Sequence, residues 1–349
     1  MKDAALRQAQ AGALADAVAP ASPRGLDRRL LVVLLALGVL CVAVVVSIGI
    51  GPVYIGPATV VDALLGNADA TSNVIVRDIR APRVLVGAMV GASLAMAGAM
   101  LQGVTRNPLA DPHIVGISAG AGLVAVACIV FLPNLPVGVV QPLAFAGGFA
   151  GGGLAYVMAW RGGVSPARLA LAGIAVTSML TALTSAMLVT SAFSAQIGLR
   201  WLIGGLLGRS WQDFRLLLPY FAVGSVVALA TARQLNVIAL GDELATSLGQ
   251  RVERTRLLLT ATAALLASAA VSIAGLVGFL GLIIPHLVRL LIGNDYRFLL
   301  PASALFGAVL LVVADTAART VFDPKELPVG VLTALMGGPV FILLVRRRA

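Results

Sequence analysis

The hydrophobic positions of this chain form long runs that are separated by short polar segments. Runs without Asp, Glu, Lys or Arg are near or above the roughly 20 residues that a helix needs to cross a bilayer. Two runs are long enough for two spans, because residues 112–160 contain Pro133, Pro136 and Pro142 and residues 257–288 contain a Gly-rich turn at 275–278. The pattern predicts ten helices, over residues 30–49, 84–105, 113–131, 140–160, 168–190, 214–232, 255–275, 279–292, 298–317 and 328–345.

This pattern predicts an all-α, polytopic membrane protein with one ten-helix domain over residues 30–349. Residues 1–29 are Ala-rich and mixed in charge, and they are predicted to form a cytoplasmic tail. The first hydrophobic run is too long for the apolar part of a signal peptide, so we expect it to stay as a helix.

Composition agrees with a membrane location. Hydrophobic residues make up 59% of the 349 residues and charged residues 11%, and the mean hydropathy is +1.00. Most of the 25 Lys and Arg residues fall on one side of the predicted spans, which predicts that both termini lie in the cytoplasm. The net charge of +10 does not indicate nucleic-acid binding, because the basic residues are dispersed at helix ends.

The most informative polar segment covers residues 233–256, between the sixth and seventh predicted helices. Leu240, Leu244 and Leu248 repeat every four residues, Asp242 and Glu243 precede the second of them, and Gly249 follows the last. This spacing predicts one short exposed helix, whose apolar stripe we expect to pack against something, because two turns are marginally stable alone. The alternative is that this helix lies on the membrane surface. If it packs against a partner, either the leucines or Asp242 and Glu243 could make that contact.

Arginines also gather on the opposite, outer side. Arg80 and Arg83 precede the second predicted helix, and Arg319 follows the ninth. They could anchor the helices at lipid headgroups, or they could form ion pairs with carboxylates on an external protein.

Hydroxyl side chains mark a possible internal path. Ser165 lies in the turn before the fifth predicted helix, and Thr177, Ser178 and Thr181 lie on that helix. The turn could be a plain turn or an inner constriction. The helical hydroxyls could line an aqueous path or donate back to carbonyls of their own helix.

Missing motifs exclude several mechanisms. A phosphate-binding loop needs a lysine in a Gly-rich setting, and neither Lys2 nor Lys325 has one, so this chain cannot hydrolyse ATP by that route. The spans hold almost no ionisable groups, which disfavours an ion-coupled carrier. A Gly-x-Ser-x-Gly match at Ser118 lacks the strand that a hydrolase requires. Cys41 and Cys128 fall inside spans, so we expect no disulfide and no metal site. Energy would then come from another polypeptide acting on the cytoplasmic loops.

Several motifs, taken in order, resemble the permease subunits of bacterial type II ABC importers, the family that takes up ferric siderophores, haem and cobalamin. The resemblance extends over roughly residues 75–345. The matching segments are residues 80–83, 102–112, 116–120, 240–249, 278–286, 314–316 and 326–330.

The resemblance implies a multi-pass subunit of the bacterial inner membrane that pairs with a second copy of itself or a homologous permease around a central path. It implies two ATPase subunits, which hold ATP and Mg, and a periplasmic or lipid-anchored binding protein, whereas this chain itself, surrounded by membrane lipid, holds no cofactor. A ferric siderophore is the favoured substrate, with haem or cobalamin as alternatives.

The resemblance also implies roles for individual residues. Arg80, Arg83 and Arg319 would face acidic residues of the binding protein. The fifth helix, with Thr177, Ser178 and Thr181, and residues 194–207 would line the path and gate, while Ser165 departs from the hydroxyl pattern of the inner gate because Pro166 and Ala167 follow it. The contact with the ATPase would be made by Leu240, Gly241, Asp242, Glu243, Leu244, Leu248 and Gly249.

Overall fold

The computed structural model describes residues 23–190, 192–321 and 325–346, and every named element within them is a helix. Each of the ten predicted segments coincides with one helix, although several ends differ by a few residues. These helices are α2 (Pro23–Gly49), α5 (Ala81–Thr105), α6 (Ile117–Phe131), α7 (Val137–Met158), α8 (Pro166–Thr190), α10 (Trp211–Ala230), α13 (Val252–Ala274), α14 (Leu280–Ile292), α15 (Tyr296–Thr320) and α16 (Val329–Arg346).

Polar segments between the predicted spans also contain helices. The 233–256 segment is largely helical, because α11 (Ala232–Ala239) precedes α12 (Asp242–Ser247). The α11 helix was not predicted. It packs Leu235 and Ile238 into the core, and this burial is what orders it.

At the other end of the molecule, α3 (Pro57–Leu65), α4 (Ala70–Asn73) and a π-helix (Val74–Arg80) lead directly into α5. The α5 arginines therefore follow a helix rather than a loop. Between α8 and α10 lies α9 (Ala192–Ile203), and Trp211 begins α10. The predicted tail of residues 1–29 lies mostly outside the described residues, and α2 begins within it at Pro23.

Both double-length hydrophobic runs are divided as predicted, with one difference in detail. The first run breaks at residues 132–136, while Pro142 lies inside α7, where its missing N–H removes one intrahelical hydrogen bond. The second run breaks at residues 275–279, where Gly275 and Phe279 have positive φ angles of 70° and 69°.

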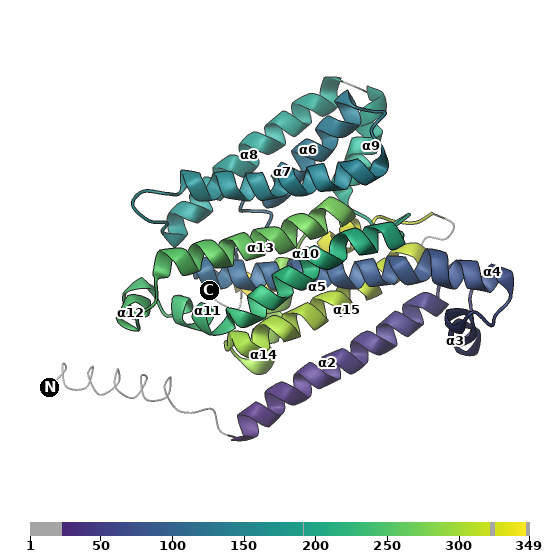
Figure 1. The fold of residues 1–349 in the computed structure, drawn as a ribbon, viewed down its shortest axis with the longest axis horizontal. Helices are drawn as coiled ribbons and strands as arrows, with labels where there is room; N and C mark the ends of the chain where they lie inside the picture. Colours follow the sequence, from purple (N-terminus) through teal and green to yellow (C-terminus); the bar gives the residue numbers. More distant parts are fainter. Residues whose placement is uncertain (1–22, 191, 322–324, 347–349) are drawn as a thin grey trace.

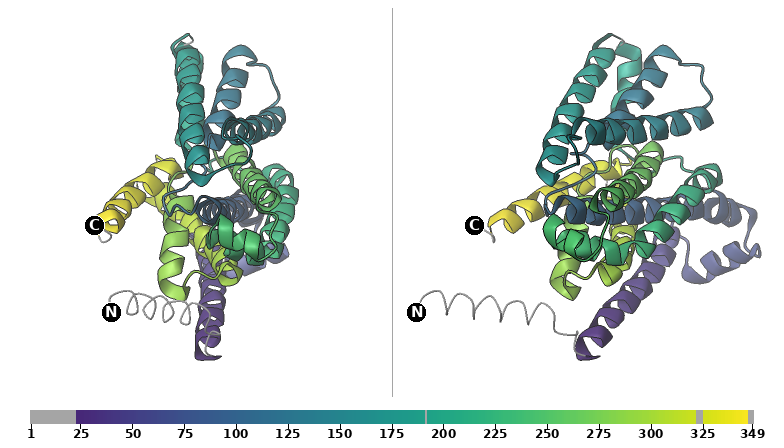
Figure 2. Two further views of the ribbon diagram at one scale, coloured as in Figure 1. Left: turned by 90° about the vertical axis from the view of Figure 1, so that its left-hand side faces the viewer. Right: turned by 60° about the vertical axis from the view of Figure 1, so that its left-hand side comes forward.

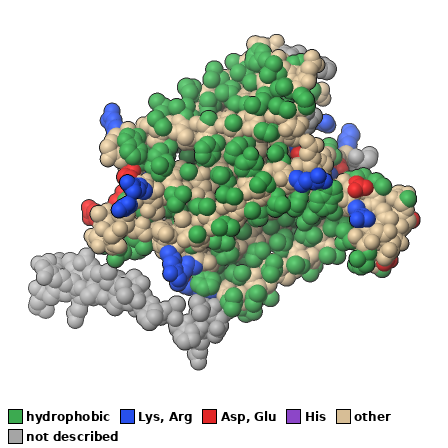
Figure 3. Space-filling model, in the orientation of Figure 1, with side chains coloured by type: hydrophobic (Ala, Val, Ile, Leu, Met, Phe, Trp, Pro, Cys, Tyr) green, Lys and Arg blue, Asp and Glu red, His purple; other side chains and the backbone are tan. Residues whose placement is uncertain are grey.

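The helices form a membrane protein with several spans. Within the described residues, six segments are long and apolar enough to cross a bilayer. Figure 3 shows hydrophobic side chains over the middle of the molecule and charged side chains gathered toward its two ends. The six segments are Arg28–Gly49, Ala70–Thr105, Pro166–Thr190, Trp211–Ala230, Val252–Ala274 and Tyr296–Thr320.

Helix α5 lies at the centre of the molecule and is almost completely buried, with α10, α13, α14 and α15 packed around it (Figure 1). Helices α6, α7, α8 and α9 form a second group, which contacts α13 chiefly through α6 and α7 (Figures 1 and 2). The α12 helix, the first residues of α2 and the end of α16 lie at one end, and α3 and α4 lie at the other (Figure 1).

Glycines let the α5 backbone approach its neighbours more closely than any side chain would permit. A Cβ atom at Gly98 would lie 2.0 Å from the carbonyl oxygen of Gly281 in α14, and one at Gly91 would lie 2.2 Å from that of Gly307 in α15. Close approach through small residues is how membrane helices gain packing energy without a hydrophobic driving force. These glycines therefore serve packing.

We predict that Gly98→Ala lowers the free energy of unfolding by at least about 2 kcal/mol, because the new methyl group must push α5 away from α14. Gly38→Ala in α2 is the matched control, since a Cβ at Gly38 meets nothing within 4 Å. Thermal unfolding of the two variants in detergent checks this. Equal midpoints would show that the α5–α14 contact does not limit stability.

Candidate functional site

The short helix α12 is exposed on its apolar side. Leu240, Leu244 and Leu248 are 60%, 56% and 65% exposed, whereas Ala245 on the opposite side is buried. The leucine stripe therefore does not pack within this chain, and the surface that it packs against stays a prediction. Gly241 and Gly249 flank the helix with positive φ angles of 118° and 78°, so the chain turns sharply at both ends of α12.

Asp242 holds α12 to the body of the protein. Its carboxylate accepts a hydrogen bond of 2.7 Å from Nη2 of Arg256 in α13 and lies 3.4 Å from Nη2 of Arg106, the residue that ends α5. Glu243, by contrast, is exposed. The predicted contact residues thus divide into two groups: Asp242 faces inward, and the leucines with Glu243 face outward.

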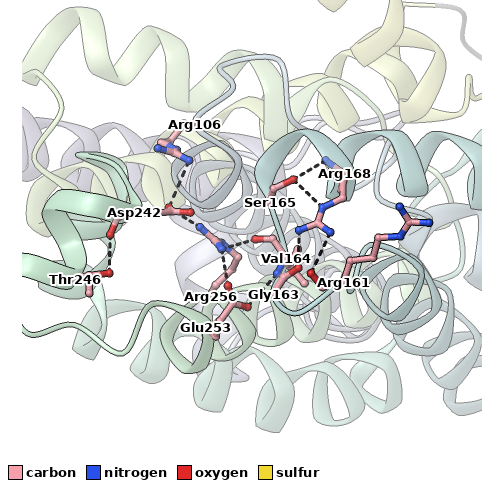
Figure 4. A network of polar contacts seen from close by, with 10 residues as sticks. All are labelled: Arg106, Arg161, Gly163, Val164, Ser165, Arg168, Asp242, Thr246, Glu253 and Arg256. Carbon is pink, nitrogen blue, oxygen red and sulfur yellow. Dashed lines mark hydrogen bonds and ion pairs between the residues drawn. The ribbon is translucent and has the colours of Figure 1, made fainter.

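Arg256 is the centre of a wider polar network (Figure 4). Its side chain is 1% exposed, and its Nη1 donates to Glu253 Oε1 at 3.1 Å and to the carbonyl oxygen of Val164. Glu253 Oε2 in turn accepts from the backbone N–H of Val164 at 3.1 Å. Both backbone groups of Val164 are therefore held by α13.

The same network continues through the turn between α7 and α8. Arg168 donates to Ser165 Oγ at 3.1 Å and to the carbonyl oxygens of Gly163 and Arg161 at 2.8 and 3.3 Å. Ser165 is therefore part of an ordered turn at the start of α8. The network connects α5, α12, α13 and the α7–α8 turn, four segments that are far apart in the sequence (Figure 4).

Sequence reasoning missed Arg256, which stands in a polar run with three other arginines. Its periodicity could have revealed it, because Arg256 lies three and seven residues before Leu259 and Ala263, on the buried face of α13. Sequence reasoning also missed the roles of Arg106 and Glu253 in this network.

The predicted path residues do not form one cluster. Thr177 donates to the carbonyl oxygens of His113 and Ile114 at 3.2 and 3.4 Å, so it bonds to another segment instead of its own helix. Ser178 and Thr181 lie on the exposed face of α8. The structure thus brings Ser165 into the polar network around Arg256 and leaves Ser178 and Thr181 on a surface of this chain.

At the opposite end, Arg83 is buried and doubly paired. Its Nε and Nη2 each donate at 2.9 Å to the two carboxylate oxygens of Asp315 in α15, and its Nη1 donates at 2.9 Å to Glu326. A bidentate pair of this kind fixes both side chains. Because Asp315 is held by Arg83, it is not a free carboxylate of the sort that an ion-coupled carrier uses.

Arg80 and Arg319 are also buried, and both bind the end of α2. Arg80 donates to the carbonyl oxygens of Ile48 and Gly49 at 2.8 and 3.0 Å, and Arg319 donates to the carbonyl and hydroxyl oxygens of Ser47. These contacts join α2, α5 and α15 at the end of the molecule where α3 and α4 lie. The two guanidinium groups are therefore not lipid anchors in this structure, and docking of a partner protein on them stays a prediction.

A cavity of about 270 Å³ lies beside Arg83. Arg200 and Arg209 also line it, and Arg209 pairs with Asp213 at 3.2 Å. Apolar side chains and a tryptophan form the rest of the wall. The other lining residues include Ile129, Ile197, Trp201, Leu206, Leu207, Glu326 and Leu327.

The serine of the Gly-x-Ser-x-Gly match has a different setting from a hydrolase nucleophile. Ser118 is buried in the first turn of α6, and Gly116 and Gly120 contact α7 at Gly147 and Gly151. The two glycines of the motif serve helix packing, and the flanking structure is not a strand.

The fold and the site together define the membrane subunit of a transporter: a bundle of spanning helices with a short, outward-facing helix tied into its interior. The match to the FecCD transport family covers residues 39–347, and the chain belongs to this family. Permeases of this family work in a complex with a partner permease and ATPase subunits.

Curated relatives and a solved structure agree with this assignment. The chain is 42% identical to the Fe(3+)-citrate import system permease protein YfmE of Bacillus subtilis over 322 residues, which cover 92% of this chain and 96% of the relative. It is 50% identical to the cobalamin import system permease protein BtuC of Halobacterium salinarum over 279 residues, 80% of this chain and 75% of the relative. A solved inward-facing transporter, assigned to the metal-chelate type of ABC transporter, matches with a TM-score of 0.82 and 29% identity over 90% of this chain and 98% of that chain.

We predict that Arg83→Met destabilises the protein by about 3–5 kcal/mol, because Asp315 is left buried and unpaired. Adding Asp315→Leu removes the stranded carboxylate and should recover most of that loss. Unfolding midpoints of the single and double variants in detergent measure the effect. A double variant as unstable as the single one would contradict the pairing.

A second prediction concerns Asp295, which caps α15. Burial raises the pKa of this carboxyl, but hydrogen bonds from Arg297 and Asn236 outweigh burial and lower the pKa to about 2. Because the folded pKa lies below the ordinary value of 3.8, the stabilisation is present above pH 4 and is lost as the pH falls toward 2. Asp295→Asn should therefore be less stable at pH 6 and show a smaller further loss between pH 4 and 2 in thermal unfolding. An unchanged pH dependence would refute this.

Proposed function

We propose that this chain is the permease subunit of an ATP-driven importer that carries an iron complex across the inner membrane of a bacterium, with ten spans and both termini in the cytoplasm. Family membership and the names of the relatives support transport of a metal chelate or cobalamin. A ferric siderophore or ferric citrate is the favoured substrate, and haem or cobalamin is the alternative.

The observation that carries this proposal is the exposed leucine stripe of α12. Burying one leucine side chain contributes about 1.5–3 kcal/mol, so three side chains that are more than half exposed, Leu244 on α12 and Leu240 and Leu248 just beside it, favour a protein partner. We assign the ATPase to this surface. Leu240, Leu244, Leu248 and Glu243 would enter its groove, while Gly241 and Gly249 set the turns and Asp242 anchors the helix from behind.

A second permease copy, or a homologous permease, would cover α8. This helix is long enough to span the bilayer, yet only 22% of its most apolar window is buried within the chain. Its exposed face carries Ser178 and Thr181 together with Leu171 and Ile174. Hydroxyl groups suit a hydrated path between two subunits better than a lipid-facing surface, whereas the apolar faces of the other helices would contact lipid.

The outer end would receive a periplasmic binding protein. Arg80, Arg83 and Arg319 are proposed to support this docking surface, and of the three Arg83 reaches the outer cavity. Arg83 and Arg209 are already paired with carboxylates of this chain, so Arg200 is the lining arginine proposed to meet carboxylate or other anionic oxygen groups, on the partner or on an iron chelate.

Uptake of radioactive iron into proteoliposomes tests the proposal. Vesicles with this chain, its ATPase and its binding protein should accumulate ferric citrate or a ferric siderophore only with ATP, and unlabelled haem or cobalamin should compete poorly. Replacing Leu240, Leu244 and Leu248 together by alanine should reduce ATPase association and uptake at least tenfold, because the buried contact is lost.

Leu65→Ala is the matched control, since Leu65 is 69% exposed at the opposite end of the molecule. It should leave ATPase association unchanged. Uptake that persists without an ATPase, or that a protonophore abolishes at constant ATP, would contradict the proposal and favour an ion-coupled carrier.

A further inference from the structure

The network around Arg256 connects two separate segments, α12 and the turn that starts α8, which would both move during transport. On one side, Asp242 belongs to α12, the proposed ATPase contact. On the other side, Val164 belongs to the turn that starts α8, the helix proposed to line the path. Arg256 binds both through neighbouring nitrogens of one guanidinium group, Nη2 to Asp242 and Nη1 to Val164 (Figure 4).

Burial makes this connection stiff. An arginine that is 1% exposed is costly to keep charged unless carboxylates and carbonyls satisfy it. Arg256 and Arg106 are balanced here by Asp242 and Glu253. If α12 moved away alone, the Arg256 charge would lose a partner while staying buried, so movement of Arg256 with α12 is favoured over separation.

The turn before α8 is held at two points. Arg256 donates to the Val164 carbonyl, and Glu253 accepts from the Val164 N–H at 3.1 Å. These two bonds go to the two peptide units that flank the Val164 Cα, and together they fix the orientation of the turn as well as its position. The turn then passes this constraint to α8 through Arg168 and Ser165.

The ends of α12 allow it to move as a unit. Gly241 and Gly249 adopt positive φ angles, and a Cβ at Gly249 would meet nothing within 4 Å. A displacement imposed on the leucine stripe can therefore turn α12 about its two ends. The Asp242–Arg256 pair is then a direct side-chain route from α12 to the α7–α8 turn.

We propose that Arg256 is a positioning residue that transmits the displacement of α12 to the turn at the start of α8, and so couples ATP hydrolysis to opening of the path. This inference rests on the proposed function. It assigns to Arg256, with Asp242 and Glu253, a role in coupling that is separate from binding the ATPase.

The test uses the full complex in proteoliposomes and measures three quantities: ATPase association, the rate of ATP hydrolysis and the amount of iron taken up per ATP. Arg256→Met should keep association and hydrolysis within about twofold of wild type and reduce uptake per ATP at least tenfold. Arg256→Lys keeps the charge but cannot hold both partners in the same geometry, so it should recover only part of the coupling.

Arg254→Met is the matched control, because Arg254 lies two residues away on the same helix and is exposed. It should leave uptake per ATP unchanged. Asp242→Asn removes the charge at the other end of the pair, and since Asp242 is 41% exposed on its side chain, this variant remains informative if Arg256→Met does not fold. The Arg256→Met/Asp242→Asn double variant should take up as much iron per ATP as the weaker single variant, because both substitutions break the same ion pair.

The outcomes separate the two proposals. Normal uptake per ATP in a folded Arg256→Met or Asp242→Asn protein would overturn the coupling role and leave the importer function intact. If iron uptake per ATP fell only as far as the unfolding midpoint fell, Arg256 would be a stabilising residue alone. That result would also overturn the inference. Absence of ATP-dependent uptake in the wild-type complex would instead contradict the proposed function.

Discussion

The close backbone contact of α5 with α14 and α15 is the constraint on which the rest of the structure depends. Gly91 and Gly98 bring these helices within the reach of backbone atoms, and no other residue type would fit. Because α5 is fixed in this way along its length, its two ends are placed precisely relative to the neighbouring helices. Arg83 then meets Asp315 at one end, and Arg106 meets Asp242 at the other.

At both ends of the molecule, ion pairs and hydrogen bonds satisfy the buried charged groups, but the two networks differ in what they hold together. At the end with α3 and α4, the buried arginines are satisfied by carboxylates and by carbonyls of α2, which lock three helices together. At the end with α12, the network includes a half-exposed carboxylate on a short helix that has few other attachments. The first network is therefore suited to holding a shape, and the second to passing on a change of shape.

Much of the fold could be predicted because long apolar runs leave a membrane chain little choice but helix. The ten predicted segments, the breaks near 133 and 275 and the short helix at 242 all follow from hydrophobic runs, proline and glycine. The α11 helix could not be predicted in the same way, since its stability comes from packing Leu235 and Ile238 on distant helices.

For the candidate site, sequence reasoning found the exposed surface but not what lies behind it. The leucine spacing around α12 is a local pattern, so a single sequence shows it. The ion pairs of Arg83 and Arg256 join residues that are distant in the chain or embedded in a polar run, and a single sequence does not show which charges become buried. For that reason the outer arginines were expected at the surface, and Arg256 was overlooked.

One consequence follows from the way α13 holds Val164. Arg256 and Glu253 contact its carbonyl and N–H groups, and neither contact involves the valine side chain. The two hydrogen bonds therefore do not depend on which side chain stands at position 164, and proline alone would remove one of them. Because these contacts use backbone atoms, the residue type at position 164 need not change together with residues 253 and 256. Methods that infer contacts from co-variation between positions would therefore not detect this connection.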